Sequence, residues 1–257
     1  MEFVKYTTKR GRKNKEEYQK AVEKGVEKFK KRLNNKITTV ISDKEPRNND
    51  CDIEASYLCH GVWNKLLRNE EIGSGNYFCW ANNSYNSEII FHFDIMNNPC
   101  KTNNNIYSCG LFKDQGEKDR IEFEKMYHCI GNIALMPWFE TNNSNYINGQ
   151  MLHKALDERW DLYLSVLRNN WSDWNKFSED FTFEEYMKIS LQQVYYKDVY
   201  EMAIKKKIGE ISKDDIENWN VMISSNKELI SFDNDKNVIK KIKTITEIRC
   251  QMIKVSL

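Results

Sequence analysis

The sequence predicts an α+β fold class, namely a mainly helical single domain with a small antiparallel sheet in its first half. Apolar residues recur three and four positions apart in several segments, which is the spacing of amphipathic helices. Two short runs rich in β-branched and aromatic residues flank an Asn-rich turn and indicate paired strands. The 257 residues, 12% of them aromatic, suffice to bury a sizeable core. We divide the chain into a basic arm with an amphipathic helix (1–36) and a mixed, mainly-α globular domain (37–257).

The elements of the first half follow in order. Behind a basic stretch at 1–14, helical spacing extends over residues 15–33, and it returns over residues 52–67. Two strands are predicted at residues 77–80 and 89–95, and a turn joins them. Residues 117–127 can form a helix. Residues 129–136 predict a strand or an extended core segment that ends at Pro137, because proline has no amide hydrogen to donate to a sheet.

The segment 151–171 predicts a central amphipathic helix. At about 100° per position, one face collects Leu152, Leu156, Trp160, Tyr163, Val166 and Leu167. Arg159 falls near the middle of this apolar face, whereas Asp161 belongs to the opposite, polar face. A guanidinium keeps its charge when buried, so it needs a carboxylate, carbonyl groups or a bound anion as partner. Arg159 is therefore either half of a structural ion pair or an anion-binding residue in a pocket.

The last third predicts three more helices. Residues 183–207 are predicted to form a second long helix, with these side chains inward: Met187, Leu191, Val194, Tyr195 and Met202. Ser212 is an N-cap candidate because acids follow it in the first turn. The spacing of the last apolar residues predicts a final helix, although their β-branched content leaves a strand open: Val238, Ile242, Ile245, Ile248 and Met252.

The charge is distributed unevenly along the chain. Residues 1–36 hold 13 Lys and Arg against 5 Asp and Glu, a net charge of +8, and the other 221 residues hold 26 against 33, a net of −7. This basic segment could contact nucleic acid or an acidic partner. Alternatively, its helix packs on the acidic remainder of the chain and its lysines only face water. The candidate contact residues are Lys9, Arg10, Arg12, Lys13, Lys24, Lys28 and Lys31.

The seven cysteines contain no C-x-x-C pair, and no apolar segment follows the N-terminus. We therefore expect reduced thiols and a cytoplasmic location. No run approaches the roughly 18 apolar residues that span a bilayer, so we expect no membrane partner. Cys-His pairs at 59–60 and 128–129 could meet around zinc, but their separation carries no metal signature and we predict no metal site.

The string from His128 to Met136 resembles a His-x-(Ile/Leu)-Gly-Asn-Leu-x-Leu-Leu segment of the GmrSD-type modification-dependent restriction enzymes, whose C-terminal nuclease domain is HNH-like. The resemblance implies that His128 activates water while a metal ion stabilises the phosphate transition state. The other half of the motif is absent, because no Glu-His or Asp-His pair precedes an apolar-Pro turn upstream. The implied nuclease would be degenerate.

A broader resemblance covers residues 56–169. It rests on four segments, in this order: Ser56 to Lys65, Ile130-Gly131 through Pro137, Ile147-Asn148-Gly149-Gln150-Met151, and Arg159-Trp160-Asp161-Leu162. These resemble a bacterial family without an assigned activity, and the chain departs from its pattern at Val62, Asn132, Gln150, Glu158 and Trp160. The resemblance implies a domain with five polar residues set among core ones: His60, Lys65, Asn148, Arg159 and Asp161. If these converge they suit a phosphate or carboxylate, and otherwise they brace the helix against the sheet.

The favoured hypothesis is a soluble interaction or inhibitor protein, of prophage or defence-locus origin, that binds a protein or nucleoprotein partner. A basic front precedes an acidic body, and no complete catalytic set accompanies the candidates. The second hypothesis is a protein or enzyme that binds a phosphate-bearing ligand through Arg159, Lys65 and His60. The third is the degenerate HNH-like nuclease, with His128 and His60 as catalytic candidates. The sequence identifies no cofactor.

Overall fold

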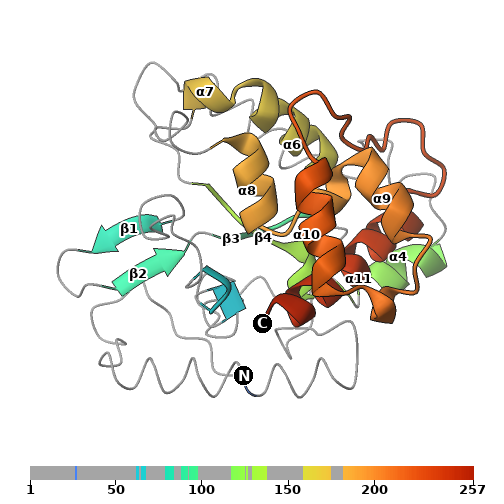
Figure 1. Cartoon of the computed structure of the whole chain (residues 1–257). Helices are drawn as coiled ribbons and strands as arrows, with labels where there is room; N and C mark the ends of the chain where they lie inside the picture. Colours follow the sequence, from blue (N-terminus) through green and yellow to red (C-terminus); the bar gives the residue numbers. More distant parts are fainter. Residues whose placement is uncertain are drawn as a thin grey trace.

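The computed structural model describes a little over half of the chain (Figure 1). The described residues are 62–63, 65–67, 79–83, 88–91, 93–97, 117–124, 129–137, 159–174 and 182–257, together with Glu27 and Met126. Within them the chain is mainly helical, as predicted. Apart from Glu27, which is helical and exposed, the predicted basic arm and its helix lie outside the described residues.

The described strands form two separate antiparallel pairs. β1 (Cys79–Asn83) pairs with β2 (Glu88–Phe91). β3 (Phe93–Ile95) pairs with β4 (Ile133–Leu135), which places Asp94 opposite Ala134. The single small sheet expected in the first half of the chain is not confirmed, because the described strands form two pairs and β4 lies beyond the midpoint of the chain.

Helices occupy most of the remaining described residues. α4 (Glu117–Glu124) and the 3₁₀ helix η2 (Ile130–Asn132) precede β4. The others follow it: α6 (Trp160–Asn169), α7 (Trp171–Trp174), α8 (Phe183–Ile189), η4 (Gln193–Tyr195), α9 (Lys197–Ala203), η5 (Ile208–Glu210), α10 (Lys213–Met222) and α11 (Val238–Ser256).

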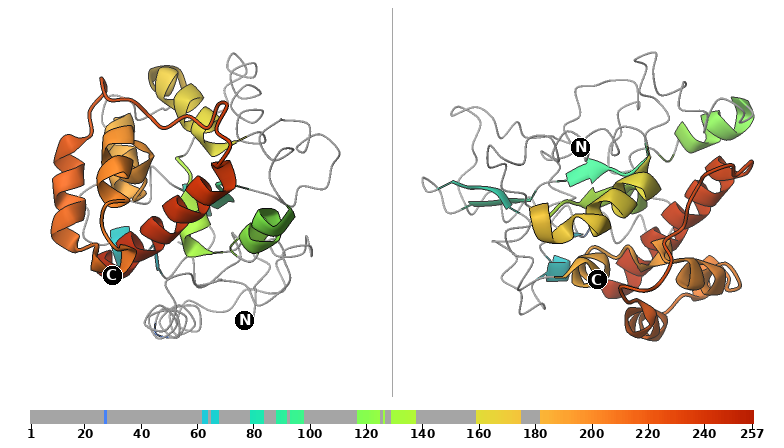
Figure 2. Two further views of the ribbon diagram at one scale, coloured as in Figure 1. Left: turned by 90° about the vertical axis from the view of Figure 1, so that its right-hand side faces the viewer. Right: turned by 90° about the horizontal axis from the view of Figure 1, so that it is seen from above.

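α11 is the helix on which the core is built. It packs against η2, α4 and α10, and in Figure 2 it crosses the molecule beside the segment that holds η2 and β4. The five apolar positions predicted to face inward on it are all buried. The final helix is thus confirmed, and its β-branched residues are tolerated because tertiary packing outweighs helix propensity in a core.

The predicted single helix over residues 183–207 is wrong. α8 ends at Ile189, Leu191 adopts a positive φ of 52°, and α9 begins only at Lys197. In a continuous helix the carbonyls of Ser190 and Leu191 would accept bonds from the amides four residues later. Here they accept hydrogen bonds of 2.9 Å from the guanidinium of Arg249 on α11. The chain therefore turns, and the new helix faces the core differently.

The change of direction between α8 and α9 explains which side chains of residues 183–207 are buried. Met187, Leu191, Val194 and Tyr195 are buried, as predicted. Met202 is 42% exposed, so its predicted inward position is wrong. In α9 the inward positions are Val199 and Ala203 instead.

The predicted N-cap at Ser212 is confirmed. Its hydroxyl accepts the Asp215 amide at 3.3 Å, and the Asp215 carboxylate accepts the Ser212 amide at 2.9 Å. This reciprocal capping box satisfies two amides that have no partner within the helix. Thr182 and Glu185 form the same arrangement at the start of α8.

Candidate functional site

The candidate site is organised around Arg159, which lies just before α6 rather than within a helix. The helix begins at Trp160, and Arg159 is its N-cap residue in an extended conformation, with φ −168° and ψ 149°. The expectation that Arg159 sits on the apolar face of one helix over residues 151–171 is therefore wrong. Trp160, Tyr163 and Leu167 are buried, as predicted for that face. Residues 151–158 lie outside the described residues.

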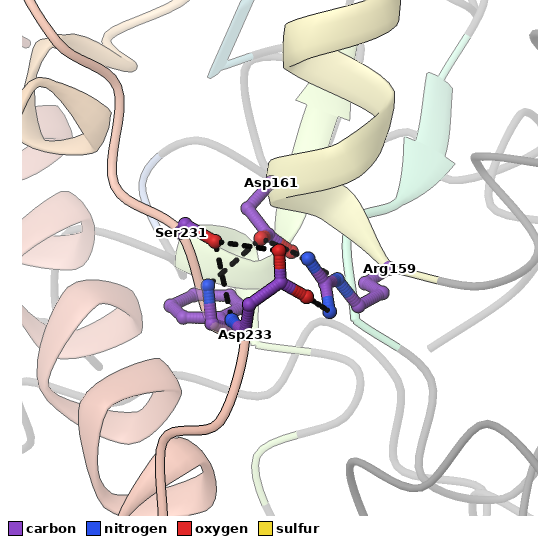
Figure 3. Close-up of polar contacts among 5 residues, drawn as sticks. Arg159, Asp161, Ser231 and Asp233 are labelled. Carbon is purple, nitrogen blue, oxygen red and sulfur yellow. Dashed lines mark hydrogen bonds and ion pairs between the residues drawn. The ribbon is translucent and has the colours of Figure 1, made fainter.

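The guanidinium of Arg159 lies between two carboxylates (Figure 3). Its Nε donates to Oδ1 of Asp161 at 2.9 Å and its Nη2 donates to Oδ2 at 2.8 Å, which is a bidentate pair. Its Nη1 donates to Oδ1 of Asp233 at 2.6 Å. All three nitrogens thus bond to carboxylate oxygens, the strongest class of hydrogen bond available to an arginine.

Asp161 was predicted to point to solvent, but it is only 3% exposed. Its Oδ2 also accepts the backbone amide of Phe232 at 2.9 Å. Burial raises the pKa of Asp161, while the Phe232 amide and the charge of Arg159 oppose that shift. The pattern-based prediction failed because a carboxylate can be buried when a cation and an amide from distant segments satisfy its oxygens.

Asp233 holds the outer side of the guanidinium, and its side chain is 68% exposed. The hydroxyl of Ser231 donates to Oδ2 of Asp233 at 3.1 Å and accepts the Asp233 amide at the same distance. The hydrogen bond from Arg159 lowers the pKa of Asp233. We call Arg159, Asp161, Ser231 and Asp233 the Arg159 cluster, which ties the loop before α11 to the start of α6.

The geometry of the Arg159 cluster favours a structural ion pair over an anion-binding residue. With both aspartates ionised, one cation faces two anions, and a phosphate or carboxylate ligand would meet repulsion from both. The ligand would also have to displace hydrogen bonds that already engage every nitrogen of the guanidinium. The Arg159 cluster therefore bridges two segments of the chain, since Arg159 and Asp233 are 74 residues apart in the sequence.

A second arginine holds the same loop at the other end of α6. Arg168 donates to the carbonyl of Lys227 at 2.7 Å, and also to the carbonyls of Ser224 and Ser225. Its guanidinium carbon lies 5.8 Å from the ring centroid of Tyr196. The loop between α10 and α11 is therefore attached to both ends of α6, by Arg168 and by Arg159.

The sequence reasoning missed Arg249, which is completely buried on α11. Its Nη1 donates to the carbonyls of Gly131 at 2.6 Å and Ile133 at 3.0 Å, in addition to its bonds with Ser190 and Leu191. Burial lowers the pKa of its guanidinium. The available signal was positional, because Arg249 continues the inward series of Ile242, Ile245 and Met252 at helical spacing.

Of the other predicted site residues, only Lys65 is described. It lies in the helical stretch 65–67 and is partly buried. His60, Asn148 and His128 lie outside the described residues. So do the predicted contact residues at 9, 10, 12, 13, 24, 28 and 31.

The part of the chain that the structure describes also bears on metal binding and on membrane insertion. No three or more His, Cys, Asp and Glu side chains are grouped there so that they could hold a metal ion. None of the described helices has the length and apolar character needed to cross a membrane. The chain was compared with protein-family models, with curated proteins and with solved structures, and none of the three comparisons gave a match.

Proposed function

We propose that this protein acts by binding a protein or nucleoprotein partner, as an interaction or inhibitor protein, with the basic segment 1–36 as its contact region. The observation that carries the proposal is the charge distribution, a net of +8 over residues 1–36 against −7 over residues 37–257. Opposite charge on a partner accelerates encounter and orients the two molecules. The seven contact candidates are among the 13 Lys and Arg that supply the positive charge of this segment.

The contacts of the described arginines support a scaffolding role for the body of the protein. Arg159 is held by Asp161 and Asp233, Arg168 by the carbonyls of residues 224, 225 and 227, and Arg249 by four carbonyls of the core. These cations connect segments within the molecule, which suits a rigid platform that presents a binding segment. The phosphate-ligand hypothesis relied on Arg159, Lys65 and His60, and among the described residues Arg159 is held by two aspartates instead.

The test compares two full-length variants that remove the same charge from different places. Lys24→Gln, Lys28→Gln and Lys31→Gln together neutralise part of the basic segment. The control replaces three exposed lysines of the body: Lys205→Gln, Lys213→Gln and Lys240→Gln. The probes are a 20-nucleotide single-stranded RNA, a 20-base-pair DNA duplex and polyglutamate, followed by any protein captured from the cell of origin and then purified.

We expect wild type and the control to bind a probe or purified partner with affinity that falls as salt rises. The basic-segment variant should bind about tenfold more weakly at low salt, because fewer counterions are released. The salt dependence should be shallower for that variant. Equal binding by the two triple variants, or no salt-dependent binding by wild type, would refute the proposal.

A further inference from the structure

Two cysteines from distant parts of the chain meet in the core. Cys129 precedes η2 and Cys250 lies in α11, 121 residues later, and both are completely buried. Their Sγ atoms are 3.0 Å apart. Both are reduced thiols in this structure. A disulfide bond is about 2.05 Å long, so a shift of about 1 Å would join the two sulfurs.

Gly131 is the residue that permits this close approach. A Cβ at position 131 would overlap the carbonyl oxygen of Thr246 and lie 2.8 Å from the Sγ of Cys250. Any side chain here would therefore push η2 away from α11 and separate the sulfurs. The absence of a side chain brings the backbone of η2 directly onto the turn of α11 that carries Cys250.

Arg249 holds the two segments together and places a positive charge beside the thiols. Among the described residues, its hydrogen-bond acceptors are backbone carbonyls and the Met96 sulfur rather than carboxylates. Both Cys129 and Cys250 interact electrostatically with its charge. A cation in a low-dielectric interior favours negative charge on a nearby sulfur, and the thiolate is the reactive form of cysteine.

We infer that Cys129 and Cys250 form a redox-active dithiol that hydrogen peroxide oxidises to an intramolecular disulfide. The first thiol loses its proton and its thiolate attacks one oxygen of hydrogen peroxide. An S–O bond forms, the O–O bond breaks, and the leaving hydroxide takes up that proton and departs as water. The second thiol then attacks the sulfenic sulfur, the S–S bond forms and the S–O bond breaks. A second water leaves. The dithiol loses two electrons and the peroxide gains them.

Burial decides how the reaction proceeds and what it changes. Because both sulfurs are buried, hydrogen peroxide reaches them through local opening of the contact between η2 and α11. Once formed, the disulfide closes a loop of more than a hundred residues and restricts the unfolded chain. The oxidised protein should therefore melt about 5–15 °C above the reduced protein. This inference is independent of the proposed partner binding.

The experiment uses the reduced full-length protein freed of reductant. It is treated with increasing hydrogen peroxide, the remaining thiols are blocked with N-ethylmaleimide in denaturant, and the peptides are identified by mass spectrometry. We expect a peptide pair joined through Cys129 and Cys250 that increases with peroxide and disappears with dithiothreitol. The melting temperature should rise over the same range of peroxide concentrations in which the peptide pair increases.

Variants link the thermal effect to this pair. Cys129→Ser and Cys250→Ser should each lose the rise in melting temperature, while Cys59→Ser should retain both the peptide pair and the rise. The peptide analysis of wild type decides the matter even if the serine variants fold poorly. Recovery of Cys129 and Cys250 as blocked thiols, as sulfinic or sulfonic acids, or joined to other cysteines would overturn the inference.

Discussion

The guanidinium of Arg249 donates a hydrogen bond of 2.6 Å to the carbonyl oxygen of Gly131, which lies 118 residues earlier in the chain. The same side chain bonds the carbonyls of Ile133, Ser190 and Leu191. One buried arginine thus joins α11 to β4, to η2 and to the turn that ends α8. Removal of its donors would leave several buried carbonyl groups without partners, which is costly in a low-dielectric interior.

Arg249→Met keeps a long apolar side chain but removes those donors. We expect a loss of about 3–5 kcal/mol in the free energy of unfolding, measured by urea denaturation followed by circular dichroism. The control is Lys240→Met, an exposed position of the same helix, which should change stability by less than about 0.5 kcal/mol. Similar stabilities for the two variants would show that the carbonyls find other donors.

The two aspartates that hold Arg159 should contribute unequally. Asp161→Asn changes a nearly buried carboxylate that bonds both Arg159 and the Phe232 amide, and we expect a loss of about 2–4 kcal/mol. Asp233→Asn changes a carboxylate that is 68% exposed, and the loss should stay below about 1 kcal/mol. Urea denaturation of both variants at neutral pH gives the comparison. If Asp233→Asn were the more damaging, the outer ion pair would be the stronger one.

Acid should weaken the ion pair between Arg159 and Asp233. The hydrogen bond from Arg159 lowers the folded-state pKa of Asp233 below the unfolded value of about 3.9. Stabilisation by this group is therefore complete above the unfolded pKa and is lost as pH falls through the folded pKa.

The measurement is the urea midpoint of wild type and Asp233→Asn between pH 6 and pH 2.5. The difference between the two proteins should shrink below about pH 4, where the wild-type carboxylate becomes protonated. Asp161 contributes with the opposite sign, since its pKa is raised, and it is present in both proteins. A difference that stays constant or grows toward low pH would contradict this account.

Two glycines allow a matched test of packing. Gly131→Ala would place a Cβ against the Thr246 carbonyl, and we expect a loss of about 3 kcal/mol because backbone atoms must move apart. Gly209→Ala meets nothing within 4 Å, so it should be neutral or stabilise slightly by restricting the unfolded chain. Thermal denaturation of both variants provides the readout. Equal melting temperatures would mean that η2 and α11 can separate at little cost.

Local patterns predicted well where a single segment decides its own structure. The N-cap at Ser212 depends on a hydroxyl and a carboxylate three residues apart, so the sequence contains the whole motif. The final helix follows from the spacing of Ile242, Ile245 and Met252, which determines the side that can be buried. The alternative of a strand was decided in favour of the helix by packing against η2, α4 and α10.

Predictions failed where distant partners supply the missing interactions. Residues 183–207 have helical spacing throughout, yet Arg249 binds the carbonyls at 190 and 191 and the helix ends. Asp161 belongs to a polar face by its spacing, yet Arg159 and the Phe232 amide allow it to be buried. Neither outcome is encoded within the segment that it changes.

The sequence by itself determined the uneven charge, the helical content and the places where apolar faces occur, because these depend on composition and on short-range spacing. Tertiary structure alone decided which arginine is buried, which carboxylates hold Arg159 and which cysteines meet. Arg159 and Arg249 both interrupt an apolar series in the sequence. One became the bridge to a surface aspartate and the other the buried junction of the core. The choice depends on an aspartate 74 residues away for Arg159, and for Arg249 on acceptors between 58 and 153 residues away.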